Sequence, residues 1–134
     1  MSAPADWQVV EAGPIVFRVP PELVEPGGPS VDSAAGTLES EVITVTYDVG
    51  RFGPDLDQLA MEHQVLTTER RRVAGHTGTE MTFRPAGEPF ELARLLQLAL
   101  GGGQTATVRV SCRAADECRI ADTVFDSIAL VPTR

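Results

Sequence analysis

The strongest constraint on the fold is a pair of cysteines, Cys112 and Cys118, which are the only two in the chain. Residues 105–112 alternate apolar and polar side chains as a β-strand does, and a stripe with helical spacing begins after them. Cys112 shares the parity of Val108 and Val110, so it points toward the core, as Cys118 does from the helical stripe. The short connection brings their Cα atoms within the roughly 4.4–6.8 Å that a disulfide requires. We therefore predict a disulfide between a strand end and the first turn of a helix.

Two other interpretations of this pair stay open. Both thiols can be reduced core residues, because free cysteine packs as a small hydrophobic side chain. One can be a catalytic nucleophile, since a helix N-terminus favours the thiolate. Zinc is disfavoured, because two cysteines at this spacing lack further ligands. A disulfide would indicate an oxidising compartment.

Length and charge limit the functional class. We expect one domain over residues 1–134, with residues 1–6 as a flexible N-terminal segment. All the basic residues among Lys and Arg are arginine. The net charge of −8 argues against nucleic acid as a partner. Residues 1–66 hold eleven acids and two arginines, whereas residues 67–134 hold eight acids and nine arginines. The acidic half is either a solvated surface or a face for a basic partner.

No membrane-spanning run and no signal-peptide pattern are visible in the sequence. The protein is therefore either cytosolic or an exported protein whose leader is absent from this chain. The cysteine pair favours the second, with an extracytoplasmic location in the periplasm or cell envelope; the cytoplasm is the alternative.

The first half predicts strands followed by a helix. Residues 7–10 and 15–19 form a β-hairpin, and four prolines make residues 20–30 a loop. Residues 41–49 are the clearest strand, with residues 30–38 as its hairpin partner.

A helix should begin after Asp55, which is a good N-cap, with Gln58 as its capping-box partner. Its expected apolar stripe is Leu56, Leu59, Ala60, His63 and Leu66.

The second half predicts two more hairpins and a closing helix. Residues 70–74 and 77–84 pair around turn residues Gly75, His76 and Gly78.

Residues 90–100 have high helix propensity, but the alternating segment after Gly101–Gly103 favours a strand hairpin. In that hairpin, Leu96, Leu98 and Leu100 would lie opposite Val108, Val110 and Cys112. The last element is a helix over residues 116–129.

No residue pattern indicates a catalytic centre, and we expect neither enzymatic activity nor a cofactor. His63 lies on an apolar stripe and His76 in a turn, without a nucleophile nearby in the sequence. Asp55, Asp57, Glu62 and His63 do not share one helical face, so a metal site is disfavoured.

Two segments are candidate partner-binding surfaces. One is the proline-rich loop at Glu22, Leu23 and Val24, and the other is the basic run Arg70, Arg71 and Arg72. In a strand, Arg71 points away from the face of its two neighbours, and we expect it to pair with acids of the first half.

Four segments resemble the Mog1/PsbP-like superfamily, particularly its bacterial PsbP-like lipoproteins and adaptors. Residues 17–20 resemble its opening strand, residues 42–48 its central strand, residues 73–76 a hairpin turn, and residues 122–128 its closing helix. The resemblance covers nearly all of residues 7–131. It implies an α+β fold in which helices flank an antiparallel sheet (an α/β/α sandwich), and it supplies no catalytic residues to carry over.

The resemblance and the cysteine pair together suggest a non-enzymatic, extracytoplasmic binding or assembly module. Its partner would be another protein, a lipid or a cell-envelope component. The alternative is a cytosolic chaperone-like adaptor with reduced cysteines that shields a segment of a secreted protein. A small enzyme that uses Cys112 or His63 is a third hypothesis.

Overall fold

The computed structural model describes residues 3–26, 34–51 and 53–131 of the chain. Its elements follow one another as β1 (Gln8–Ala12), β2 (Ile15–Val19), β3 (Ala35–Glu39), β4 (Ile43–Gly50), α1 (Leu56–Glu62), β5 (Gln64–Val73), β6 (His76–Arg84), β7 (Leu92–Gly101), β8 (Gln104–Cys112), the 3-10 helix η1 (Ala115–Arg119), α2 (Ile120–Asp126) and β9 (Ala129–Leu130).

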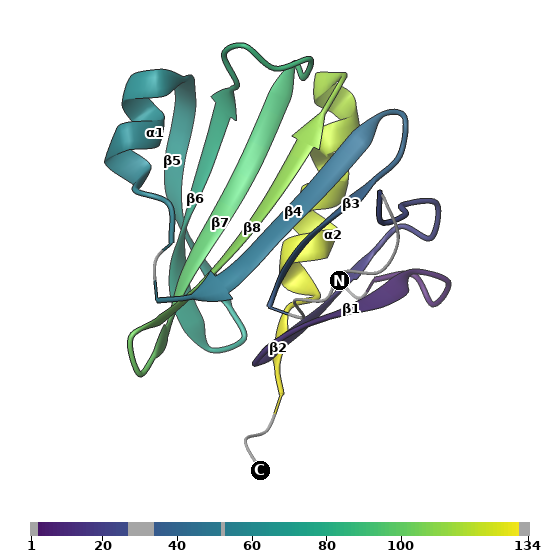
Figure 1. Cartoon of the computed structure of the whole chain (residues 1–134), viewed down its shortest axis with the longest axis vertical. Helices are drawn as coiled ribbons and strands as arrows, with labels where there is room; N and C mark the ends of the chain where they lie inside the picture. The colour runs from purple at the N-terminus through teal and green to yellow at the C-terminus, as the bar shows by residue number, and fades with distance from the viewer. Residues whose placement is uncertain (1–2, 27–33, 52, 132–134) are drawn as a thin grey trace.

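A six-stranded antiparallel sheet, in the order β3-β4-β8-β7-β6-β5, forms the centre of the fold. A smaller sheet, β1-β2-β9, lies with α2 on one face of the large sheet, and α1 lies beside β5 at the other end (Figure 1). This arrangement confirms the predicted α+β class, an antiparallel sheet flanked by helices.

The main core lies between the large sheet, the small sheet and α2. Alternate residues of β2 and β4 are buried in it, as the period-two pattern predicts, and the Phe17 and Tyr47 rings pack edge to face with centroids 5.5 Å apart. A second, smaller cluster lies on the opposite face, where Leu56 and Leu59 of α1 pack near Phe83. The face of the large sheet that packs against α2 therefore has a larger hydrophobic core than the face that packs against α1.

The first predicted hairpin is confirmed, and so is the strand at residues 41–49, which pairs with β3. Residues 27–33 lie outside the described residues. They include part of the predicted proline-rich loop and part of the predicted hairpin partner of β4. Residues 1 and 2 of the expected N-terminal segment also lie outside the described residues.

Residues 90–100 form a strand, as the alternation favoured, but their predicted register is wrong. Leu96 lies opposite Val108 as expected, whereas Leu98 lies opposite Ala106, and Cys112 pairs with Leu92. The pairing runs antiparallel, so partners of later residues in β7 come earlier in β8.

The helix predicted from Asp55 ends sooner than its stripe suggested. His63 caps the C-terminus and β5 begins at Gln64, so Leu66 belongs to a strand. The Asp55 side chain accepts hydrogen bonds from the backbone N–H groups of Asp57 and Gln58, which confirms the N-cap. The Gln58 side chain donates to Glu62 instead of completing a capping box.

The turn between β5 and β6 is Ala74–Gly75, where both residues have positive φ. The prediction that His76 and Gly78 are turn residues is wrong. Gly78 lies within β6, where a Cβ atom would come 2.6 Å from the Gln97 carbonyl oxygen, so glycine permits a close approach of strands there.

The closing helix is shorter than the predicted residues 116–129. It starts as η1, becomes α2 at Ile120, and ends where the Ser127 hydroxyl donates to the Val124 carbonyl oxygen. Ala129 then pairs with Val16 of β2, because the edge of the small sheet offers backbone partners there.

Candidate functional site

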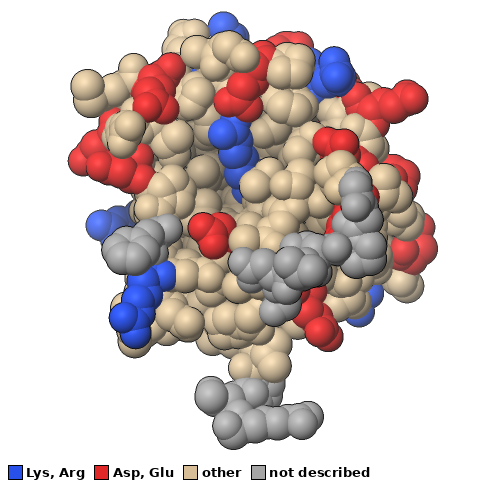
Figure 2. All heavy atoms as spheres, viewed as in Figure 1, with Lys and Arg blue, Asp and Glu red and all other residues tan. Residues whose placement is uncertain are grey.

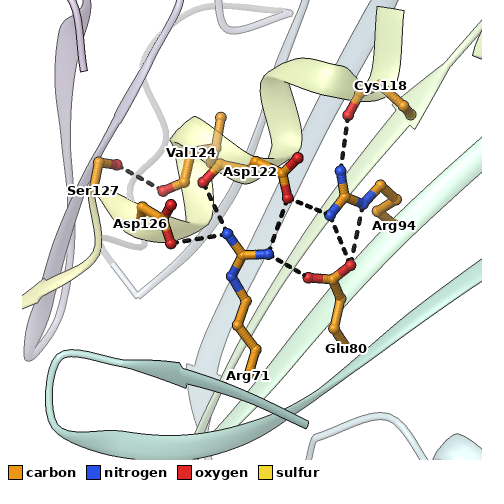
Figure 3. Close-up of polar contacts among 8 residues, drawn as sticks. All are labelled: Arg71, Glu80, Arg94, Cys118, Asp122, Val124, Asp126 and Ser127. Carbon is orange, nitrogen blue, oxygen red and sulfur yellow. Dashed lines mark hydrogen bonds and ion pairs between the residues drawn. The ribbon is translucent and has the colours of Figure 1, made fainter. Parts of the chain in front are cut away.

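The basic run of β5 is divided between the two faces of the sheet. The Arg71 side chain lies on the α2 side, where its guanidinium binds carboxylates of Glu80, Asp122 and Asp126 at 2.8–3.0 Å (Figure 3). The same guanidinium also donates to the Asp122 backbone oxygen. Arg71 is thereby fixed between β6 and α2.

A second arginine completes this network. Arg94 of β7 binds Glu80 at 2.7 Å and Asp122 at 2.6 Å, and also donates to the Cys118 carbonyl oxygen (Figure 3). Glu80 is a buried carboxylate that both arginines share, so its desolvation cost is offset by paired hydrogen bonds. We call Arg71, Glu80, Arg94, Asp122 and Asp126 the arginine–acid network.

Hydrogen bonds within this network favour the charged forms of Arg71, Arg94 and Asp122. Burial lowers the pKa of Arg71, but hydrogen bonds to Asp126, Asp122 and Glu80 outweigh it and leave that pKa raised. The pKa of Arg94 is raised in the same way against burial. The hydrogen bond from Arg94 lowers the pKa of Asp122, against an opposing effect of burial. All three groups therefore stay charged at neutral pH.

The network joins α2 to the large sheet. Both guanidinium carbons lie over the buried Phe125 ring, at 5.6 Å for Arg71 and 5.8 Å for Arg94. The expectation that Arg71 pairs with acids of the first half is wrong, because all its acidic partners lie in the second half. The sequence held a signal for the role of Arg94. It lies two residues from both Leu92 and Leu96, so in a strand its side chain points to the same face as these two apolar side chains.

The predicted disulfide is confirmed and lies beside this network. Cys112 and Cys118 are bonded, with Cα atoms 5.6 Å apart and side chains 0% and 1% exposed. The bond links the end of β8 to η1 within the main core. Neither sulfur is a free thiol in this structure.

Arg70 and Arg72 lie on the other face of β5, away from Arg71. Both side chains are exposed, and neither forms an ion pair with any residue that the structure describes. Unlike Arg71, neither forms an ion pair or a side-chain hydrogen bond with a described residue.

The predicted loop surface is divided in a similar way. Leu23 is 1% exposed and belongs to the main core, whereas the Val24 side chain is 63% exposed and Glu22 is also exposed. The Val24 backbone pairs with Glu39 through hydrogen bonds of 2.8 and 2.9 Å, which places the loop beside the outer edge of β3. Glu22 and Val24 are therefore exposed beside that edge.

The histidines have local roles. The His63 Nδ1 accepts a hydrogen bond from the Ala86 N–H at 2.9 Å, and its ring packs on Phe83. His76 pairs with Val73 next to the hairpin turn.

The face opposite α2 contains a shallow recess of about 220 Å³ between the sheet and α1. Figure 2 shows this face, with a basic side chain crossing its middle beside a hollow and an acidic side chain below it. Arg109 lines the recess, and its charge is paired with Glu88 at 2.8 Å while its guanidinium lies over Phe83. The recess is therefore lined mainly by apolar atoms, with Asp48 and the paired Arg109 as its charged residues.

Comparisons with known proteins identify the fold. No family model matches the chain, and no curated protein matches it. The solution structure of cyanobacterial PsbP (CyanoP) from Synechocystis sp. PCC 6803 has a TM-score of 0.63 with this chain and is 14% identical to it. The match covers 96% of this chain and 95% of that one. The predicted PsbP-like fold is confirmed.

Proposed function

We propose that this chain is a single-domain, non-enzymatic extracytoplasmic module that binds another protein. The observation that carries the proposal is the division of β5 into two faces. Arg71 is engaged within the fold, whereas Arg70 and Arg72 are exposed and without ion-pair partners among the described residues. Exposed charged side chains without ion-pair partners, on an open sheet edge, are a common basis for partner recognition.

The disulfide supports the extracytoplasmic part of the proposal. Buried disulfides persist in oxidising compartments and are rare in the cytosol, so the bond favours export over the cytosolic adaptor with reduced cysteines. None of the described helices is long and apolar enough to cross a bilayer.

The environment of the candidate nucleophile and base supports a non-enzymatic role. Cys112 is held in the disulfide, and His63 caps α1 while accepting a backbone hydrogen bond. Both side chains thus have structural partners in place of a reacting group.

Affinity capture of the tagged chain in its native cell tests the binding role. Two surface variants are compared, Arg70→Glu/Arg72→Glu on β5 and Glu22→Arg/Val24→Ser on the loop. We expect the β5 variant to lose a partner that the wild type captures, while its unfolding midpoint stays unchanged. Identical partner sets from the wild type and both variants would contradict the proposal.

Thiol trapping in the same cells tests the compartment. The cells are quenched in acid and the protein is denatured in the presence of an alkylating reagent, which should label neither Cys112 nor Cys118. Labelling of both in most molecules would favour the cytosolic adaptor.

A further inference from the structure

The outer edge of β5 carries unpaired backbone groups in a regular array. β5 is the last strand of the large sheet, and β6 is its one neighbour among the described strands. The two-residue turn Ala74–Gly75 closes at the pair Val73 and His76. Such a closing pair is hydrogen-bonded, and bonded pairs then alternate with non-bonded pairs along the hairpin.

The alternation assigns a direction to each backbone group of β5. Glu69 and Arg71 bond to Glu80 and Gly78 of β6, whereas the N–H and C=O groups of Thr68, Arg70 and Arg72 point away from the sheet. No described residue bonds to these outward groups. The opposite edge of the sheet differs, since Val24 already pairs with Glu39 of β3. β5 is therefore the edge on which a further strand can pair.

The side chains of the same residues determine which strand can pair there. Arg70 and Arg72 are exposed and lie two residues apart on one face. In an antiparallel pair of two copies centred on Arg71, Arg70 of one copy would lie opposite Arg72 of the other. Like charges directly opposite each other are destabilising, so self-pairing in this register is disfavoured. Acidic side chains at alternate positions of an incoming strand would instead be opposite or diagonal to both arginines.

We propose that β5 binds an extended acidic segment of a partner protein as a seventh strand of the large sheet. This inference rests on the proposed protein-binding function and specifies the partner's chemistry. Backbone hydrogen bonds to Thr68, Arg70 and Arg72 supply affinity, and the two exposed arginines select acidic over neutral or basic segments. The same charges keep the edge from pairing with other strands, as is usual for edges in natural sheets.

A fluorescent peptide tests the inference directly. The probe is an extended peptide of about eight residues, a usual strand length, that alternates glutamate with valine or threonine. We expect fluorescence anisotropy to report binding that weakens steeply with salt. Hydrogen exchange should slow at the amides of Thr68, Arg70 and Arg72 when the peptide is bound, and stay unchanged at the Arg71 amide.

Two variants separate strand pairing from charge attraction. Arg70→Pro removes one outward N–H without removing a bond to β6, and should weaken peptide binding by about tenfold or more. Arg70→Glu/Arg72→Glu should release the glutamate peptide and bind the same peptide with lysine in place of glutamate. Urea unfolding of both variants must match that of the wild type. If Arg70→Pro unfolds at lower urea, peptide binding by the charge-reversed variant and the hydrogen-exchange pattern of the wild type test the inference instead.

Other results would overturn the inference. These are no binding of the glutamate peptide, equal binding to the wild type and the charge-reversed variant, or slowed exchange outside β5. Failure here is distinguishable from failure of the proposed function. Partner capture that depends on Glu22 and Val24, without peptide binding at β5, would leave the binding module in place and remove the seventh strand.

Discussion

The two faces of the large sheet carry helices of equal length that are held in different ways. α1 and α2 each span seven residues, too few for a stable isolated helix. α2 buries Ala121, Val124 and Phe125 and is tied to the sheet by the arginine–acid network and, through η1, by the disulfide, whereas α1 has no buried residue. Side-chain anchoring therefore fixes the helix on one face, while the helix on the other face depends on an N-cap and partial packing.

We expect the largest loss of stability when the apolar anchor of α2 is removed. Phe125→Ala should lower the free energy of unfolding by about 3–5 kcal/mol, because it empties a fully buried aromatic site beneath two arginines. Met61→Ala on α1, where the side chain is 87% exposed, is the matched control and should change it by less than about 0.5 kcal/mol. Urea unfolding measures both, and similar losses would refute the contrast between the faces.

Removal of the disulfide should have the next largest effect. Cys112→Ala/Cys118→Ala should cost about 2 kcal/mol, because the bond closes a short loop in the unfolded chain. A reducing agent should lower the thermal midpoint of the wild type and leave the variant unchanged. Equal midpoints for the reduced and oxidised wild type would mean that the bond adds nothing to the anchoring of α2.

The cap of α1 should matter less. Asp55→Ala leaves the N–H groups of Asp57 and Gln58 without their acceptor and should cost about 1 kcal/mol. Asp55→Asn keeps an acceptor and is expected to unfold close to the wild type. Hydrogen exchange within α1 reports the local effect, and unchanged exchange in Asp55→Ala would show that packing alone holds this helix.

The smallest effect is pH-dependent and concerns the network. The pKa of Asp122 is lowered in the folded state, mainly by the hydrogen bond from Arg94. The contribution of Asp122 to the free energy of unfolding is therefore fully present above the unfolded pKa of about 3.9. It is lost as the pH falls through the lower pKa of the folded state. Asp122→Asn should therefore be less stable than the wild type at pH 7, by under about 1 kcal/mol because the carboxylate is half exposed. The difference should vanish at acid pH. The exposed Asp116→Asn is the control, and a difference that persists or grows at acid pH would contradict the assignment.

Local patterns predicted most strands and the disulfide, because parity and helical spacing state which side of an element faces the core. Ile43, Val45 and Tyr47 are buried as their alternation requires. Residues 90–100 formed a strand despite their helix propensity, since pairing with β8 outweighs that preference.

Long-range partners could not be predicted in the same way. The acids that bind Arg71 lie 9, 51 and 55 residues away along the chain, and the order of strands brings them together. The end of α1 was also missed, because the apolar spacing through Leu66 fits a helix while the residue lies in a strand. The alternation of a strand places Arg71 on the opposite face from Arg70 and Arg72. Only the fold shows that the face of Arg71 is the one covered by α2.

We propose that Arg71 serves the fold while Arg70 and Arg72 serve recognition. Urea unfolding and binding of the glutamate peptide should be measured on Arg71→Gln and on Arg70→Gln/Arg72→Gln. We expect Arg71→Gln to lose about 2 kcal/mol of stability, because buried Glu80 loses a charged partner. The double variant should keep its stability and lose peptide binding. A double variant that unfolds early and binds normally would contradict the account.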